Sequence, residues 1–148
     1  LCKSMLGYEL FFKEETPKSL NLKSDEFVSK CYVKFEEEAT KNNSLNDLAQ
    51  QLLIKWEAND KETRDKWRKL LNWVYDGYFL TYQNYKLKEY DKEYFESEIY
   101  SEGKEIVLEA LRRKIAGFGQ EEDGAVYCDL SDVGYDKKYL IRGDGTTH

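Results

Sequence analysis

The feature that most constrains the fold of this chain is a long stretch of helical periodicity near its middle. Apolar side chains recur there every three or four positions, which stacks them on one face of a helix. The members of this face are Trp67, Leu70, Leu71, Val74, Tyr78 and Tyr82. Trp73, Tyr75 and Phe79 widen it, so we expect neighbours to cover the helix on more than one side. Trp67 and Trp73 should both be buried, between the first helices and a sheet.

Shorter helices are predicted around this central helix, which we expect to run from a cap at Asp60 to about Tyr85. The others span residues 1–12, from a cap at Ser24 or Asp25 to about Lys41, from a cap at Ser44 to the turn at Asn59, and from a cap at Ser101 through Lys114. Residues 13–23 are polar and contain the only proline, Pro17, so they predict a flexible loop.

The last thirty residues change character. Gly117, Gly119 and Gly124 indicate a loop, and the runs 125–130 and 138–142 have the composition of strands. A turn-rich segment joins the two runs, which favours a β-hairpin. The predicted fold class is therefore α+β, mostly helical, with about five helices and a small β-hairpin or sheet.

The acidic segment that follows the central helix contains the main candidate site residue. Residues 93–97 are short, aromatic and strand-like, and the strand would present Glu96 to a cationic ligand. The plainer interpretation, favoured by composition alone, is that Glu96 is a surface residue. On a strand, Glu96 and Glu98 would lie on one face about 7 Å apart, between the separations of retaining and inverting glycosidases. No tryptophan platform for a sugar flanks them, so a glycosidase has little support.

Composition excludes several classes of protein. The net charge is −6 with a pI near 5.0, which argues against a basic arm that binds DNA or RNA. The basic clusters at residues 61–69 and 112–114 are interleaved with acids and predict solvated helix faces, with an RNA contact there as the less supported alternative. No apolar run is long enough for a membrane span. The single histidine, His148, excludes histidine-based catalysis and histidine metal sites in this chain.

The cysteines and the chain ends suggest where such a chain belongs. Three cysteines, far apart and in no paired motif, indicate free thiols in a reducing compartment, which favours the cytoplasm.

The chain begins at Leu1 without an initiator methionine and stops just after a predicted strand. We therefore expect residues 1–148 to be a single internal fragment of a longer protein, monomeric when isolated.

Several short blocks occur in one order along the whole chain. They are Lys55-Trp56-Glu57, Trp67, Trp73-Val74-x-x-Gly77-x-x-x-x-Tyr82, Tyr94-Phe95-Glu96-Ser97-Glu98, Gly103-Lys104, Asp123-Gly124-Ala125-Val126-x-x-Asp129-Leu130 and Asp144-Gly145-Thr146. In this order and at these spacings the chain resembles arginyl-tRNA synthetase, and the segment 2–6 looks like the start of this region in some bacterial members. No single block is specific, but their combination is.

The resemblance implies a class I synthetase, in which a connective insertion splits an α/β nucleotide-binding catalytic domain. This chain would be that insertion and its flanks. The full-length enzyme would use ATP with magnesium to activate arginine and transfer it to its tRNA. The family's two ATP signatures, His-x-Gly-His and Lys-Met-Ser-Lys, are absent here, so the fragment alone should be inactive. The acidic residue of the Glu-Ser block falls on Glu96, which the resemblance assigns to arginine binding. The alternative is a non-catalytic helical interaction module or a synthetase-like paralogue.

Overall fold

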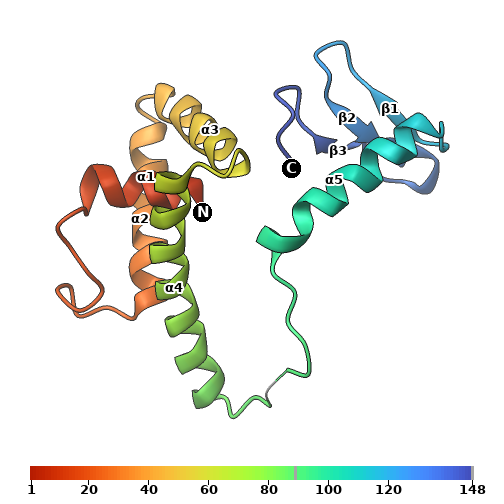
Figure 1. The fold of residues 1–148 in the computed structure, drawn as a ribbon. Helices are drawn as coiled ribbons and strands as arrows, with labels where there is room; N and C mark the ends of the chain where they lie inside the picture. The colour runs from red at the N-terminus through yellow and green to blue at the C-terminus, as the bar shows by residue number, and fades with distance from the viewer. Residues whose placement is uncertain (89, 148) are drawn as a thin grey trace. The chain divides into compact units, whose positions relative to one another are not determined.

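A computed structural model describes residues 1–88 and 90–147, and the chain divides into two compact units. Unit 1 comprises residues 1–89 and unit 2 comprises residues 90–148. Within the described residues there are five α-helices and one three-stranded antiparallel sheet (Figure 1). The predicted class, mostly helical α+β with a small sheet, is confirmed.

Unit 1 is built from the four helices that the periodicity predicts. They are α1 (Cys2–Phe11), α2 (Ser24–Ala39), α3 (Ser44–Glu57) and α4 (Lys61–Asn84). Asp60 caps α4 as expected, because its Oδ1 accepts from the backbone nitrogen of Thr63 at 2.9 Å. Ser24 and Ser44 were predicted as caps, but they are the first helical residues after Lys23 and Asn43.

The core of unit 1 is an aromatic cluster enclosed by α1, α2 and α4. Its buried members are Met5, Tyr8, Phe27, Val28, Cys31 and Leu70. Trp73 is half-buried against them, with its ring 5.5 Å from that of Tyr8 and 5.4 Å from that of Phe27, both edge to face. A Cβ atom at Gly7 would lie 2.0 Å from the carbonyl oxygen of Cys31, so the backbones of α1 and α2 nearly touch there.

The central helix is covered over less of its surface than predicted. Trp67 packs on the same cluster as Trp73, and the centroid of its ring lies 5.3 Å from the centroid of the Trp56 ring. Both tryptophans are only half-buried, and the contacts that bury them come from the helices of unit 1. Tyr78 and Phe79 are 46% and 61% exposed, so the widened apolar face predicted for the second half of α4 is not buried.

The loop between α1 and α2 contains turns and no helix or strand. Thr16 and Ser19 exchange backbone–side-chain hydrogen bonds of 2.9 and 3.0 Å, and Leu20 and Leu22 pack against the core. The flexibility of residues 13–23 stays a prediction.

In the described part of the chain no helix has the length and apolarity of a membrane span. The three cysteines, Cys2, Cys31 and Cys128, are free thiols.

Unit 2 consists of one helix beside a small sheet. The helix is α5 (Glu96–Arg112), and the strands are β1 (Phe118–Gln120), β2 (Val126–Cys128) and β3 (Lys138–Ile141), in that order across the sheet. A short 3-10 helix at Ser131–Val133 joins β2 to β3. The predicted hairpin is the antiparallel β2–β3 pair, in which Tyr127 lies opposite Tyr139.

The strand β1 was missed, because its glycine was taken as a loop signal. Gly119 pairs with Tyr127 in the sheet. A Cβ atom at Gly119 would lie 2.4 Å from the hydroxyl oxygen of Tyr127, so that ring crosses over the glycine. Here the glycine makes room for an aromatic side chain of the neighbouring strand and does not end the strand.

Candidate functional site

Glu96 is the first residue of α5 and does not lie on a strand. The helix begins five residues before the predicted cap at Ser101, and Phe95, with φ −100° and ψ 126°, is the extended residue that precedes it. The prediction of a strand at 93–97 was wrong, because aromatic residues were weighted above the two acids. Glu96 and Glu98 stand in the first helical turn, where negative charge is stabilised by the helix dipole.

The environment of Glu96 is open. Its side chain is exposed, and the first turns of α5 extend past the strands in Figure 1. Within residues 1–88 and 90–147 no side chain donates a hydrogen bond or forms an ion pair with Glu96. Its carboxylate is thus free to accept two parallel hydrogen bonds from a guanidinium group. Glu98 is two residues further along the helix and faces away, which removes the paired geometry that a glycosidase needs.

A tight turn follows β3 and contacts α5. Asp144 Oδ1 accepts from the backbone nitrogen of Thr146 at 3.0 Å and from its hydroxyl at 2.8 Å. Gly145 has φ +82°, a conformation that favours glycine. Thr146 is 3% exposed. The Nζ of Lys104, from α5, donates to the carbonyl oxygen of Gly145, so the helix that begins at Glu96 also holds this turn.

The two aspartates of the block at residues 123–130 have the same local role. Asp123 Oδ1 accepts from the backbone nitrogen of Ala125, and Asp129 Oδ1 accepts from that of Ser131, each at 3.0 Å. The hydrogen bonds from Ser131 lower the pKa of Asp129. An aspartate that accepts from the residue two positions on forms an Asx turn. The structure therefore accounts for these aspartates as turn formers.

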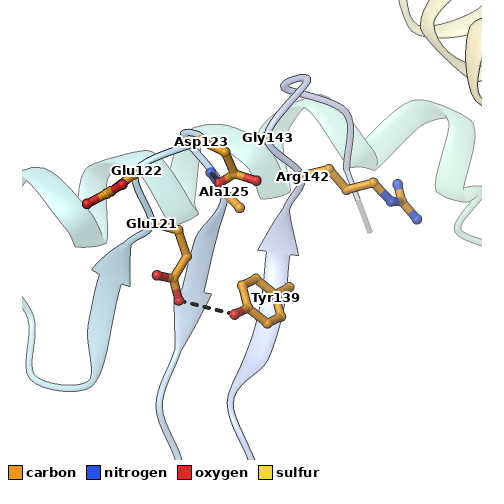
Figure 2. A pocket seen from close by; sticks show the side chains of 7 residues that line it. All are labelled: Glu121, Glu122, Asp123, Ala125, Tyr139, Arg142 and Gly143. Carbon is orange, nitrogen blue, oxygen red and sulfur yellow. Dashed lines mark hydrogen bonds between the residues drawn. The ribbon is translucent and has the colours of Figure 1, made fainter.

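An open hollow of about 640 Å³ lies beside the sheet (Figure 2). It is lined by Glu121, Glu122, Asp123, Ala125, Tyr139, Arg142 and Gly143. Glu121 accepts from the Tyr139 hydroxyl at 3.1 Å, which raises the pKa of Tyr139, and it pairs with Lys137 at 3.3 Å. Figure 2 shows Arg142 extending away from Glu121. Glu121 and Asp123 are thus already bound by the chain's own donors.

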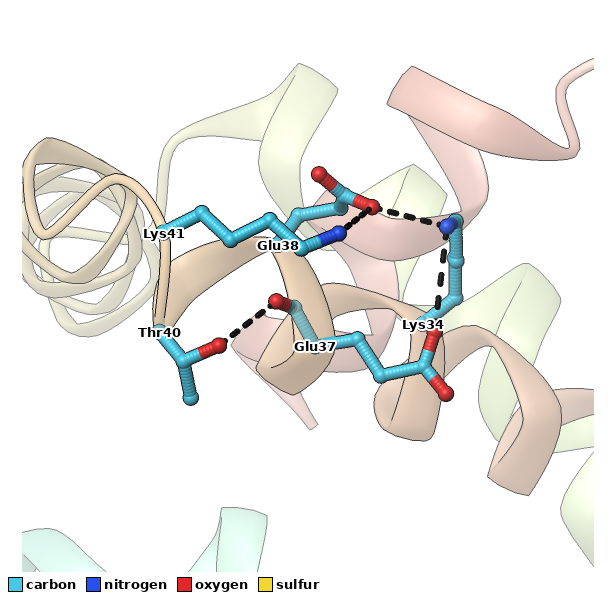
Figure 3. Close-up of polar contacts among 5 residues, drawn as sticks. All are labelled: Lys34, Glu37, Glu38, Thr40 and Lys41. Atoms are coloured by element: carbon cyan, nitrogen blue, oxygen red, sulfur yellow. Dashed lines mark hydrogen bonds and ion pairs between the residues drawn. The ribbon is translucent and has the colours of Figure 1, made fainter.

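The basic clusters are largely paired within the chain. Arg64 stacks 3.6 Å above the Trp56 ring and donates to its carbonyl oxygen at 2.8 Å, while Lys66 pairs with Glu9 at 2.5 Å and with Glu62 at 2.8 Å. A similar network covers the end of α2 (Figure 3), where Lys34 and Lys41 approach Glu38 at 2.8 and 3.0 Å. These charges form an ionic surface in which the named basic side chains already contact groups of the chain.

A metal site has no geometric support in the part of the chain that the structure describes. Among residues 1–88 and 90–147, no three His, Cys, Asp or Glu side chains are grouped so that they could hold a metal ion. His148, the only histidine, lies outside the described residues.

Sequence comparison supplies the class of protein. No protein-family model matches the chain. Over 99% of its length, however, it is homologous to ligases that act on tRNA. These relatives are arginine–tRNA ligases: those of Amoebophilus asiaticus and Bacteroides fragilis are 40% identical over 164 residues, and that of Treponema denticola is 41% identical over 149 residues. The family resemblance seen in the sequence blocks is confirmed.

The chain spans about a quarter of the length of these relatives, 25–27%.

Sequence reasoning missed the contact between Lys104 and the turn at Gly145. Both residues belong to the family-like blocks, but forty residues separate them, and only the packing of α5 beside the sheet brings them together.

Proposed function

We propose that this chain is an internal region of an arginine–tRNA ligase, an enzyme that activates arginine with ATP and magnesium and transfers it to its tRNA in the cytoplasm. The observation that carries the proposal is identity of about 40% to such ligases along 99% of the chain. The chain alone should be inactive, because its sequence contains neither of the two ATP signatures that the family uses.

Within this function, we propose that Glu96 contacts the guanidinium group of arginine. Three observations support the role: the side chain is exposed, no donor among the described residues occupies it, and it lies on a regular helix, which fixes its direction. A carboxylate matches the paired donors of a guanidinium. Arginine binding would remove this carboxylate from water and strengthen the ion pair.

A second candidate function is a non-catalytic interaction module. The exposed apolar side chains of α4, among them Phe79 at 61% and Tyr78 at 46%, favour it, because exposed apolar patches often mark protein interfaces. Such a module would tolerate loss of Glu96.

The proposal is tested by grafting. The 148 residues replace the matching region of the Treponema denticola ligase, which aligns over 149 residues. We expect the folded chimera to charge tRNA with arginine, and we expect the isolated chain to show no charging above a protein-free control. A chimera that is folded by circular dichroism and still inactive would reject the ligase function and favour the interaction module.

The role of Glu96 is tested in the same chimera by Glu96→Gln, with Glu98→Gln as the matched control. Loss of the charge that faces the substrate cation should cost about 2–5 kcal/mol, or roughly 30- to several-thousand-fold in kcat/KM for arginine. The KM for ATP should change little. Glu98 faces away from Glu96 on the helix, so Glu98→Gln should retain most activity. Equal losses in both variants, or an unchanged Glu96→Gln, would contradict the assignment.

A further inference from the structure

The contact between Lys104 and Gly145 joins two parts of unit 2 that carry family-like blocks. Lys104 lies eight residues after Glu96 on α5, about 12 Å further along the helix axis. Its Nζ donates to the carbonyl oxygen of Gly145. An uninterrupted helix of this length is stiff, so whatever fixes Lys104 also limits the movement of Glu96.

The turn that Lys104 holds is closed by its own hydrogen bonds. The backbone nitrogen of Arg142 donates to the carbonyl oxygen of Thr146, and that of Gly145 donates to the carbonyl oxygen of Arg142, each at 2.8 Å. The guanidinium group of Arg142 donates to the Thr146 hydroxyl at 3.3 Å and to the carbonyl oxygen of Thr147. The turn thus has a defined shape, and Lys104 is the cation that reaches it from α5.

We propose that Lys104 is a positioning residue for arginine binding: it holds the turn at residues 142–147 against α5, so that the turn and the Glu96 end of the helix keep one geometry. The inference rests on the proposed function, because it takes Glu96 as the arginine contact. Lys104 itself does not touch the substrate. It acts through a hydrogen bond that carries a full charge, which is stronger than a bond between neutral groups.

The first measurement uses the 148-residue chain and reports the turn alone. Lys104→Met keeps the length of the side chain and removes the donor, and Lys104→Arg keeps a cationic donor. Lys138→Met, at an exposed residue of β3, is the control. We expect Lys104→Met to speed amide hydrogen exchange at Arg142 and Gly145 about fivefold or more, as loss of one such bond allows. Lys138→Met should leave these amides unchanged.

The second measurement uses the chimera and separates positioning from general stability. Lys104→Met should raise the KM for arginine about fivefold or more, with kcat and the KM for ATP within about twofold of the parent. Lys104→Arg should restore most of the arginine affinity. Lys138→Met should resemble the parent.

Each contrary outcome has one meaning. Unchanged amide exchange in Lys104→Met would show that this bond does not hold the turn, and faster exchange with an unchanged KM for arginine would show that the turn does not influence the substrate. Equal increases in the KM for arginine and ATP would indicate a general structural role. Each of these overturns the inference. A folded parent chimera without arginine charging rejects the proposed function, and the substrate role of Lys104 falls with it.

Discussion

The two units of this chain are stabilised in different ways. Unit 1 buries large side chains: Phe27, Phe35 and Met5 are at most 1% exposed. Unit 2 buries few and smaller ones, which are Ala110, Ala125, Val126 and Ile141. Its order comes instead from hydrogen-bonded turns in which an aspartate accepts from the residue two positions on.

This difference separates two energy scales. Burial of apolar surface contributes about 25 cal/mol per Å², so each large side chain in unit 1 is worth about 2 kcal/mol or more. A single hydrogen bond in a turn contributes about 1 kcal/mol net. Substitutions in unit 1 should therefore affect stability most through packing, and those in unit 2 through individual polar groups.

The strongest test of the packing in unit 1 is Gly7→Ala. The added Cβ would lie 2.0 Å from the Cys31 carbonyl oxygen and 2.8 Å from its carbonyl carbon. Because both atoms belong to the backbone, α1 and α2 must move apart, and we expect a loss of about 3 kcal/mol or more, the upper end for overpacking. Urea unfolding followed by far-UV circular dichroism measures it.

Gly103→Ala is the matched control in the helix of unit 2. Apart from the neighbouring residues and backbone of α5 itself, no atom lies within 4 Å of a Cβ built at Gly103, and alanine favours a helix over glycine by about 0.5–1 kcal/mol. The substitution should therefore stabilise unit 2 slightly. If Gly7→Ala were neutral, or if Gly103→Ala were strongly destabilising, tight packing would not distinguish unit 1 from unit 2.

The cysteines give a second contrast, in chemical reactivity. Cys31 is completely buried in unit 1, and this burial raises the pKa of its thiol to about 11. Cys128 in unit 2 is half-buried. At pH 8 a group with this pKa is about 0.1% thiolate, the reactive form, so Cys31 should react with a thiol reagent much more slowly than the more accessible Cys128. Mass spectrometry after timed labelling resolves the two sites, and equal rates would mean that unit 1 opens readily.

Trp73→Ala tests the aromatic cluster. Its indole packs edge to face on Tyr8 and Phe27, so truncation should cost about 3 kcal/mol, the lower end for a tryptophan because the ring is half-buried. Tyr78→Ala on the exposed side of the same helix should cost far less. Similar shifts of the urea midpoint in both variants would show that the exposed face of α4 is covered in solution.

Sequence reasoning succeeded where one physical signal dominates. The periodicity of α4 and its cap at Asp60 were predicted from local residues, since helix formation depends on contacts three and four positions apart. The exposure of Tyr78 was not predicted, because the pattern defines an apolar face but does not show whether a neighbour covers it. In unit 2 the errors at Glu96 and Gly119 have different origins. At Glu96 the aromatic residues favoured a strand although two acids stand in what is the first turn of α5. At Gly119 the glycine is explained by the ring of Tyr127 on the neighbouring strand.

For the candidate site, the sequence supplied Glu96 and the family but not the local geometry. The type of residue and its block could be recognised without coordinates. That Glu96 begins a helix, and that Lys104 on the same helix reaches Gly145, depends on how residues far apart in the chain pack. Such long-range contacts leave no periodic signal in a single sequence.

Asp144→Ala tests whether unit 2 depends on its turns. The substitution removes the acceptor for the backbone nitrogen and the hydroxyl of Thr146, which is buried, so we expect a loss of about 1–2 kcal/mol. Hydrogen exchange should accelerate at the amides of β3 and the turn and remain unchanged in α1 to α4. Asp144→Asn, which keeps one side-chain acceptor, should recover part of the loss. A uniform acceleration in both units would contradict the separation of their stabilities.

The smallest effect is expected for the ionic network of Figure 3, because its members are near the surface of α2. Hydrogen bonds from Lys34 and Lys41 hold the pKa of the Glu38 carboxyl below its ordinary value, and the bond to Glu38 raises the pKa of Lys34. A carboxyl with a lowered pKa stabilises the fold above its unfolded pKa and loses that contribution as the pH falls through its folded pKa. The lysine's contribution is lost only at high pH, as the pH rises through its raised pKa.

Lys34→Met should therefore move the urea midpoint at pH 7 by less than Gly7→Ala, Trp73→Ala or Asp144→Ala. The difference from the parent should disappear below the folded pKa of Glu38, since the carboxyl is then neutral in both proteins. Titration of the Glu38 carboxyl carbon by NMR gives the direct reading: its pKa should rise in Lys34→Met but stay below the ordinary value, because Lys41 still donates at 3.0 Å. An unchanged pKa would mean that the Lys34–Glu38 pair is not formed in solution and contributes nothing measurable to the stability of unit 1.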